Sequence, residues 1–152
     1  MSITTLFMLF VVFGVTMFIA KKVASFFASC VLPLEEFREY FGEMTPAEKG
    51  NFIIRWVIVQ GLLSGFFYCV LSYIATWAMA SYVFAGGIPK YLWIAKYGIL
   101  AVIVFRGLQP METGSFLNYY GGAKYTLFIA AFVVVGGYFL ANFLLKYVGF
   151  VV

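Results

Sequence analysis

Apolar residues gather into four long stretches along the chain, and short polar segments separate them. The stretches cover residues 4–32, 52–85, 88–108 and 123–146. Lys21 and Lys22 interrupt the first of them. A helix needs about 20 apolar residues to cross a bilayer, at about 1.5 Å per residue. The pattern therefore predicts an all-α integral membrane protein with four transmembrane helices.

Two of the stretches are too long for a simple span. One helix from Pro46 to Phe84 would measure about 58 Å, whereas the hydrocarbon core is about 30 Å thick. Trp77 and Tyr82 are typical of an aromatic belt at the outer interface, so lipid contact would end near Gly65 or Leu63. We therefore expect helices 1 and 2 to extend beyond the bilayer as an inner-side helical hairpin. The predicted segments of this single domain, residues 1–152, are spans at about 4–22, 63–84, 89–107 and 123–146, with the projecting hairpin at about 23–62.

Local signals mark several of these boundaries. The segment "TPAE" at 45–48 forms a capping box, with Thr45 as N-cap, Pro46 at the first helical position and Glu48 at the third. The glycines of "AGGIPK" at 85–90 predict a tight turn before the third span. Beyond Lys22, apolar residues keep a helical spacing up to Phe41. This amphipathic stretch could lie in the interface, but we favour packing against residues 52–59, because helix 2 also needs cover.

The basic residues predict an orientation. Seven lie in the two connections that would share one side, and they are Lys21, Lys22, Arg38, Lys49, Arg55, Arg106 and Lys124. Only Lys90, Lys96 and Lys146 lie towards the other side. By the positive-inside rule both termini should be outside. The membrane would be a bacterial inner membrane or an organelle membrane.

Composition excludes much chemistry. The chain is 64% hydrophobic and 11% charged, and it contains no His and no Asp. Without these residues the usual metal sites, haem ligation and catalytic triads have no ligands or bases. Cys30 and Cys69 lie far apart, with no CxxC spacing. We therefore expect no enzymatic activity, no cofactor and no metal, and the modest net charge of +4 does not indicate a nucleic-acid partner.

Three polar residues within apolar stretches are candidates for function. Arg55 could line an ion path, but we favour a position on the projecting part of helix 2, on one face with Glu48 and Asn51. Gln60 is better explained by a helix–helix hydrogen bond. Lys96 is the candidate intramembrane charge: it could line a pore or extend its stem towards the headgroups. No apolar stretch contains an acid that could pair with it.

Small residues predict close helix packing. Gly61 and Gly65 form a GxxxG motif that Cys69 extends by one turn, and Gly137 and Ala141 repeat the spacing in the last span. Such faces serve packing within a monomer, self-association or contact with other subunits.

Two functions follow as hypotheses. The first is a non-catalytic membrane subunit that forms homo-oligomers or joins a larger complex, and whose hairpin docks or senses a partner on the inner side. Its candidate partner or lipid contacts are Glu35, Glu36, Arg38, Glu39, Glu48 and Arg55. The alternative is an oligomeric channel or pore whose anion-favouring lining includes Lys96, Arg55 or Arg106.

Overall fold

The computed structural model describes residues 3–83, 92–106 and 124–149, and these are almost entirely helical. The elements, in chain order, are α1 (Ile3–Val31), α2 (Leu34–Glu39), a short 3₁₀ helix η1 (Phe41–Glu43), α3 (Pro46–Tyr82), α4 (Leu92–Arg106) and α6 (Lys124–Val148). No strand occurs among the described residues. The predicted turn at 85–90 and the connection between α4 and α6 lie outside them.

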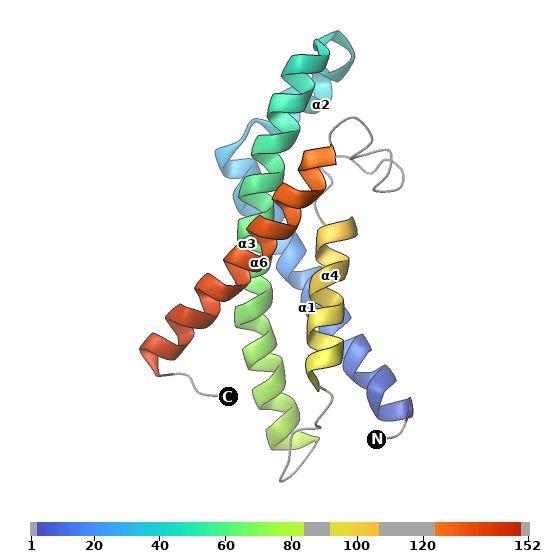
Figure 1. Ribbon diagram of the computed structural model, residues 1–152, viewed down its shortest axis with the longest axis vertical. Helices are drawn as coiled ribbons and strands as arrows, with labels where there is room; N and C mark the ends of the chain where they lie inside the picture. The colour runs from blue at the N-terminus through green and yellow to red at the C-terminus, as the bar shows by residue number, and fades with distance from the viewer. Residues whose placement is uncertain (1–2, 84–91, 107–123, 150–152) are drawn as a thin grey trace.

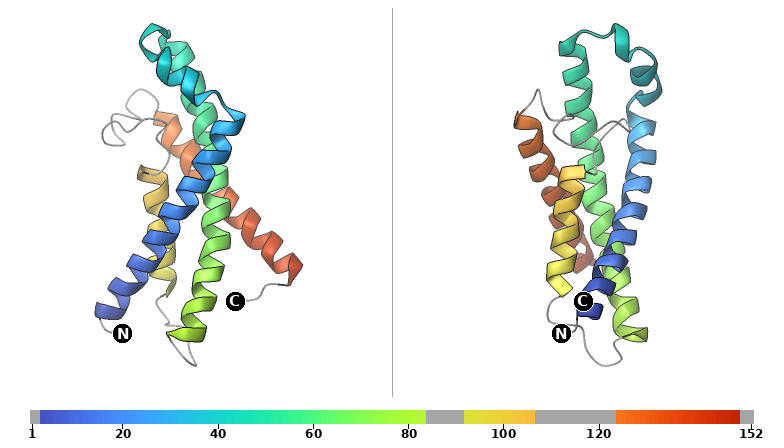
Figure 2. Two further views of the ribbon diagram at one scale, coloured as in Figure 1. Left: turned by 180° about the vertical axis from the view of Figure 1, so that it is seen from behind. Right: turned by 90° about the vertical axis from the view of Figure 1, so that its right-hand side faces the viewer.

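Helix α3 is the long axis of the molecule; α1 and α6 pack along it, and α4 packs mainly against α1 (Figure 1). Helices α1 and α4 run opposite to α3, whereas α6 crosses it obliquely (Figure 2). At one end, α1 and α3 reach past α4 and α6 and are joined there through α2. At the other end, α1 begins and α6 ends. An elongated pair of helices thus extends from a shorter bundle.

The start of α3 is fixed by the predicted capping box. The amide of Glu48 donates to the Thr45 hydroxyl oxygen at 3.3 Å, and the amide of Thr45 donates to a Glu48 carboxylate oxygen at 3.4 Å. Pro46 occupies the first turn, where its missing N–H costs nothing. This prediction is confirmed, and α3 then continues without interruption past Arg55 and Gln60.

Within the described residues, three helices are long and apolar enough to cross a membrane, namely Ile3–Val31, Gly50–Tyr82 and Phe128–Val148. The shorter apolar helix Leu92–Val104 lies beside them. Their outer faces carry large apolar side chains such as Phe132, which is 82% exposed. A soluble domain does not leave this many large apolar side chains in water. The class of the protein is therefore all-α and membrane-embedded.

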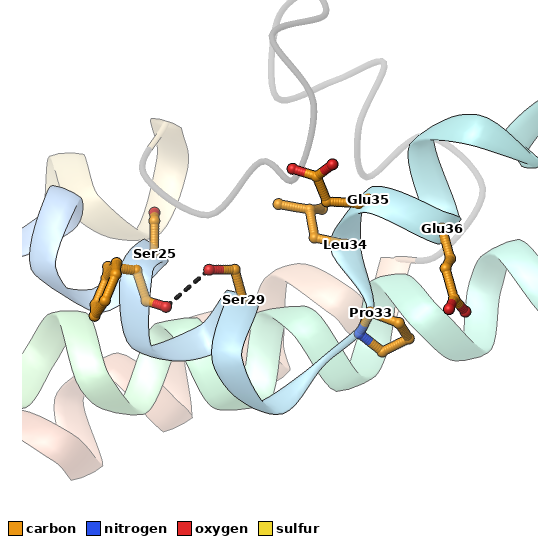
Figure 3. A pocket seen from close by; sticks show the side chains of 7 residues that line it. Ser25, Ser29, Pro33, Leu34, Glu35 and Glu36 are labelled. Atoms are coloured by element: carbon orange, nitrogen blue, oxygen red, sulfur yellow. Dashed lines mark hydrogen bonds between the residues drawn. The ribbon is translucent and has the colours of Figure 1, made fainter.

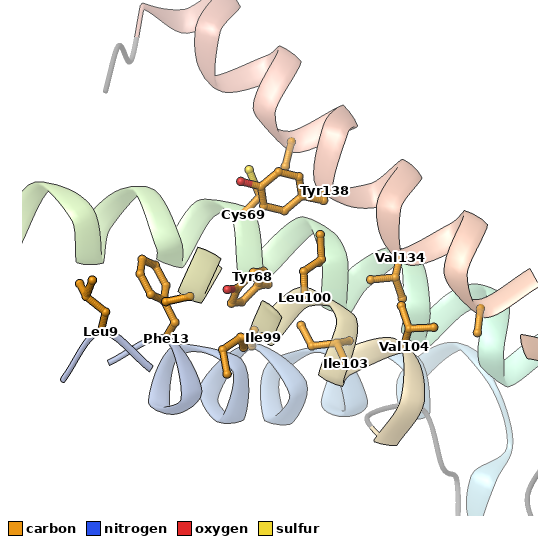
Figure 4. Close-up of a cluster of buried hydrophobic side chains, with 14 of the residues drawn as sticks. Leu9, Phe13, Tyr68, Cys69, Ile99, Leu100, Ile103, Val104, Val134 and Tyr138 are labelled. Atoms are coloured by element: carbon orange, nitrogen blue, oxygen red, sulfur yellow. The ribbon is translucent and has the colours of Figure 1, made fainter. Parts of the chain in front are cut away.

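The interior of the bundle is a layer of apolar and aromatic side chains between α3 and the helices around it (Figure 4). Phe13, Tyr68 and Tyr138 are among its largest fully buried members. On the C-terminal half of α1 the face turned inward is made of Ala20, Ala24 and Ala28, all fully buried and four residues apart. Small residues at this spacing let two helices approach closely in a membrane.

Candidate functional site

Helices α3 and α6 touch backbone to backbone at two glycines. A Cβ atom built on Gly65 would overlap the carbonyl oxygen of Val134, and one built on Gly137 would overlap the carbonyl oxygen of Leu62. Two helices can approach this closely only where neither residue carries a side chain. The structure thus brings one glycine from each predicted small-residue face into the same crossing.

The remaining members of those two faces are also buried. Gly61 is buried on α3, and Cys69 and Ala141 are fully buried. The Cys69 thiol lies beside the Tyr138 hydroxyl (Figure 4). The small-residue faces therefore serve packing inside one chain.

A row of polar or amphipathic side chains, not predicted from the sequence, runs along α3. Its members are four residues apart and less than 9% exposed: Trp56, Gln60, Ser64, Tyr68, Ser72 and Thr76. The row is about 30 Å long and runs from the predicted projecting part of α3 into its predicted span. Polar atoms avoid lipid, so the row defines the face of α3 that turns inward. Its spacing of four was visible in the sequence.

Gln60 links α3 to α1 within this row. Its side-chain nitrogen donates to the Ser25 hydroxyl oxygen at 2.6 Å. This is the helix–helix hydrogen bond that the sequence predicted. The Gln60 oxygen, the Trp56 indole nitrogen and the hydroxyls of Ser64 and Ser72 are buried with no hydrogen-bond partner among the described residues. The bundle interior is therefore polar along α3, and several of its polar side-chain atoms have no hydrogen-bond partner among the described residues.

Lys96 lies between three helices in an aromatic setting. Its ammonium is 5.0 Å from the centroid of the Tyr73 ring on α3 and 5.4 Å from that of Tyr138 on α6. The Tyr68 hydroxyl donates to the Lys96 carbonyl oxygen at 2.5 Å, and the Tyr73 hydroxyl donates to the Asn142 side-chain oxygen. The sequence flagged Lys96 but not its aromatic neighbours, because they come from other helices.

Aromatic stacking holds the α2 end against α3. The rings of Phe37 and Phe52 are stacked at 4.0 Å with an interplanar angle of 10°. Phe52 in turn stacks on Trp56 at 6.3 Å. Phe37 and Trp56 are each only 1% exposed. The chain beyond Pro33 therefore folds back onto α3 rather than leaving it.

A groove opens at the corner between α1 and α2 (Figure 3). Its volume is about 430 Å³, and it is lined by Ser25, Phe26, Ser29, Pro33, Leu34, Glu35 and Glu36. The Ser29 hydroxyl donates to the Phe26 carbonyl oxygen at 2.8 Å, which ties it to the helix (Figure 3). Glu35 and Glu36 belong to α2, and the apolar part of the lining comes from Phe26 on α1 and from Pro33 and Leu34. Such a lining suits a cationic group carried on an apolar stem.

The other candidate contacts lie on the same end of the molecule. Glu39, Glu48 and Arg55 are exposed, as is Asn51 one turn before Arg55. The side chains of Arg38 and Arg106 lie outside the described set. No group of three or more potential metal ligands occurs among the described residues.

Comparisons of the chain with protein-family models, curated proteins and solved structures found no match. Function must therefore be argued from the molecule itself.

Proposed function

We propose that this protein is a non-catalytic membrane subunit that docks a basic, partly apolar segment of another protein through the groove at the α1–α2 corner. The observation that carries the proposal is the lining of that groove. Glu35 and Glu36 supply negative charge, and Phe26 and Leu34 supply apolar surface. Lysine and arginine side chains combine a charged head with an apolar stem, so they match both parts.

The length of the helices supports a position for the groove outside the bilayer. Four spans are proposed, with α4 as the third, and Lys21 and Lys22 mark the inner interface of α1. Ser25 and Ser29 then lie within about 12 Å beyond that interface. The capped start of α3 stands beyond the same interface. The joined ends of α1, α2 and α3 thus form the projecting inner-side hairpin.

Charge on the hairpin favours a protein partner over the membrane surface. Residues 33–48 contain five glutamates against the single Arg38. An inner leaflet with anionic lipids repels such a segment. The apolar side chains nearby are nevertheless uncovered: Phe26 is 65% exposed and Val31 is 70% exposed. An exposed apolar patch edged by acids fits a basic, amphipathic protein surface.

Photo-cross-linking in cells tests this docking surface. A photoreactive amino acid replacing Phe26 is expected to form a protein adduct, whereas the same residue replacing Phe132 on the outer face of α6 should capture lipid. Glu35→Lys with Glu36→Lys should reduce the Phe26 adduct at least tenfold, because like charges across an interface cost several kcal/mol and about 1.4 kcal/mol is a factor of ten.

The matched control is Glu39→Lys with Glu43→Lys, which makes the same change of charge outside the groove. These substitutions should leave most of the adduct. Equal loss with both pairs would show that the groove is not recognised. An adduct only with lipid at position 26 would place the groove in the bilayer and contradict the proposal.

The alternative of an anion-favouring pore keeps one supporting observation, which is that no carboxylate lies beside Lys96 among the described residues. It is tested on purified protein in liposomes. A closed homo-oligomer whose anion flux disappears with Lys96→Met would replace the docking function as the main activity. The docking proposal expects no flux.

A further inference from the structure

We infer that Lys96, with Tyr73, Tyr138 and Asn142, forms a binding site for the phosphate of an anionic phospholipid. The site is distinct from the α1–α2 groove and lies towards the opposite end of the molecule. The Lys96 ammonium carries a positive charge inside the helix bundle. A lone cation in a membrane-embedded bundle needs a counter-charge or strong hydrogen-bond acceptors.

The described part of the chain offers Lys96 neither. The two tyrosine rings attract the ammonium through their faces, yet no oxygen accepts from its three N–H donors among the described residues. On α3 the nearest glutamate in sequence is Glu48, about 38 Å along the helix from Tyr73. The described parts of α4 and α6 contain no acid.

The groups around the ammonium are set to donate rather than accept. The Tyr73 hydroxyl donates to the side-chain oxygen of Asn142. The Asn142 side-chain nitrogen, with two N–H donors, has no hydrogen-bond partner within the described residues. Lys96 and Asn142 both contact Tyr73, one over its ring and one at its hydroxyl. Together they offer a full positive charge and additional donors, which matches an anionic oxygen-rich group such as a phosphate.

The depth of this site suits a lipid headgroup. Lys96 lies about 6 Å along α4 from its first described turn, and Asn142 lies about 9 Å from the end of α6. Both ends belong to the side of the bundle where α3 finishes (Figure 1). Trp77 and Trp93 are 59% and 58% exposed there, as expected of a belt at the headgroup level. A lysine stem just below this level reaches a phosphate.

A lipid fits better than an acid from another subunit. Trp93 and Tyr97 flank Lys96 on α4, and Phe139 and Phe143 flank Asn142 on α6, all of them exposed apolar or aromatic side chains. They would contact the acyl chains and glycerol of a lipid whose phosphate reaches Lys96. An anionic lipid is preferred over a zwitterionic one, because the latter would bring a second cation to the site.

The test is native mass spectrometry of the purified full chain with phosphatidylglycerol or phosphatidylcholine. The native protein is expected to retain phosphatidylglycerol selectively, and Lys96→Met should lower that retention about tenfold. Lys146→Met is the matched control, because Lys146 is an exposed lysine at the same end of the bundle. It should retain phosphatidylglycerol as the native chain does.

Further experiments distinguish a lipid phosphate from free phosphate and from a carboxylate of another chain. Asn142→Ala should weaken retention by a smaller factor, and it serves as the second variant if Lys96→Met does not fold. Equal losses with Lys96→Met and Lys146→Met would overturn the site as a general charge effect. Inorganic phosphate that protects the native protein from heat as well as phosphatidylglycerol would overturn the lipid as its source. A carbodiimide cross-link from Lys96 to a carboxylate of another chain would assign the site to a subunit contact.

Discussion

Replacing Gly137 with alanine is expected to destabilise the protein by about 1–3 kcal/mol, although alanine is the better helix former. The added Cβ would overlap the Leu62 carbonyl oxygen, which is backbone and has no rotamer to yield. Helices α3 and α6 would have to separate along their shared surface. Denaturation in mixed micelles, followed by tryptophan fluorescence, measures the change.

The neighbouring glycine provides the control. Gly136 is exposed, and a Cβ there would meet nothing within 4 Å. Gly136→Ala should therefore be neutral or stabilise the helix by up to about 1 kcal/mol. Gly65→Ala should behave like Gly137→Ala, because its Cβ would overlap the Val134 carbonyl oxygen. Identical midpoints for the two α6 variants would contradict the close crossing.

Replacing Trp56 with alanine is expected to cost about 3–5 kcal/mol, the usual effect of emptying a buried aromatic site. The side chain is 1% exposed and ends the stack that begins at Phe37. Its loss should loosen the α2 end before the rest of the bundle unfolds. Limited proteolysis within residues 34–48 should accelerate, and the denaturation midpoint should fall.

Two control variants test whether the loss in Trp56→Ala comes from the buried ring rather than from its indole N–H or from removing any tryptophan of α3. Trp56→Phe keeps most of the ring and removes an indole N–H that is buried without an acceptor in the described structure. It should be nearly neutral. Trp77→Ala on the same helix should cost little in detergent, because Trp77 is 59% exposed. A loss from Trp77→Ala as large as that from Trp56→Ala would contradict the burial pattern of α3.

Signals that act within a few residues were readable from the sequence. The capping box at Thr45–Glu48 depends on spacing alone, and it forms as predicted. The hydropathy of each stretch predicted the long apolar helices. Gln60 was expected to bond to another helix because an amide near the membrane boundary is costly to leave unpaired, and it does so.

Contacts between helices were harder to predict. Tyr73 and Tyr138 contact Lys96 only because α3 and α6 cross near it. The crossing angle depends on the side chains of both helices, so the sequence of one helix does not predict it. The stacking of Phe37 on Phe52 likewise depends on how the chain turns after Pro33. The buried row from Trp56 to Thr76 has a regular spacing of four residues. It was not predicted, because its members are aromatic, amide and hydroxyl residues rather than one residue type. The contacts that the sequence did not predict are therefore mostly between residues far apart in the chain.

We propose that the joined ends of α1, α2 and α3 project on the inner side of the membrane, and the two native cysteines report this topology directly. Cys30 is exposed near the end of α1, about 12 Å beyond Lys22 along the helix, whereas Cys69 is buried. A membrane-impermeant maleimide should label Cys30 in inverted vesicles and not in intact cells. Cys30→Ser should abolish labelling, and Cys69→Ala should preserve it.

A cysteine at the tip of the hairpin, introduced as Glu43→Cys in the Cys30→Ser background, extends this measurement. It should react from the inner side as Cys30 does, even if a docked partner covers the end of α1. Labelling of both positions from the outside would reverse the orientation. Protection of both positions from either side would place the hairpin within the bilayer and contradict the proposed docking surface.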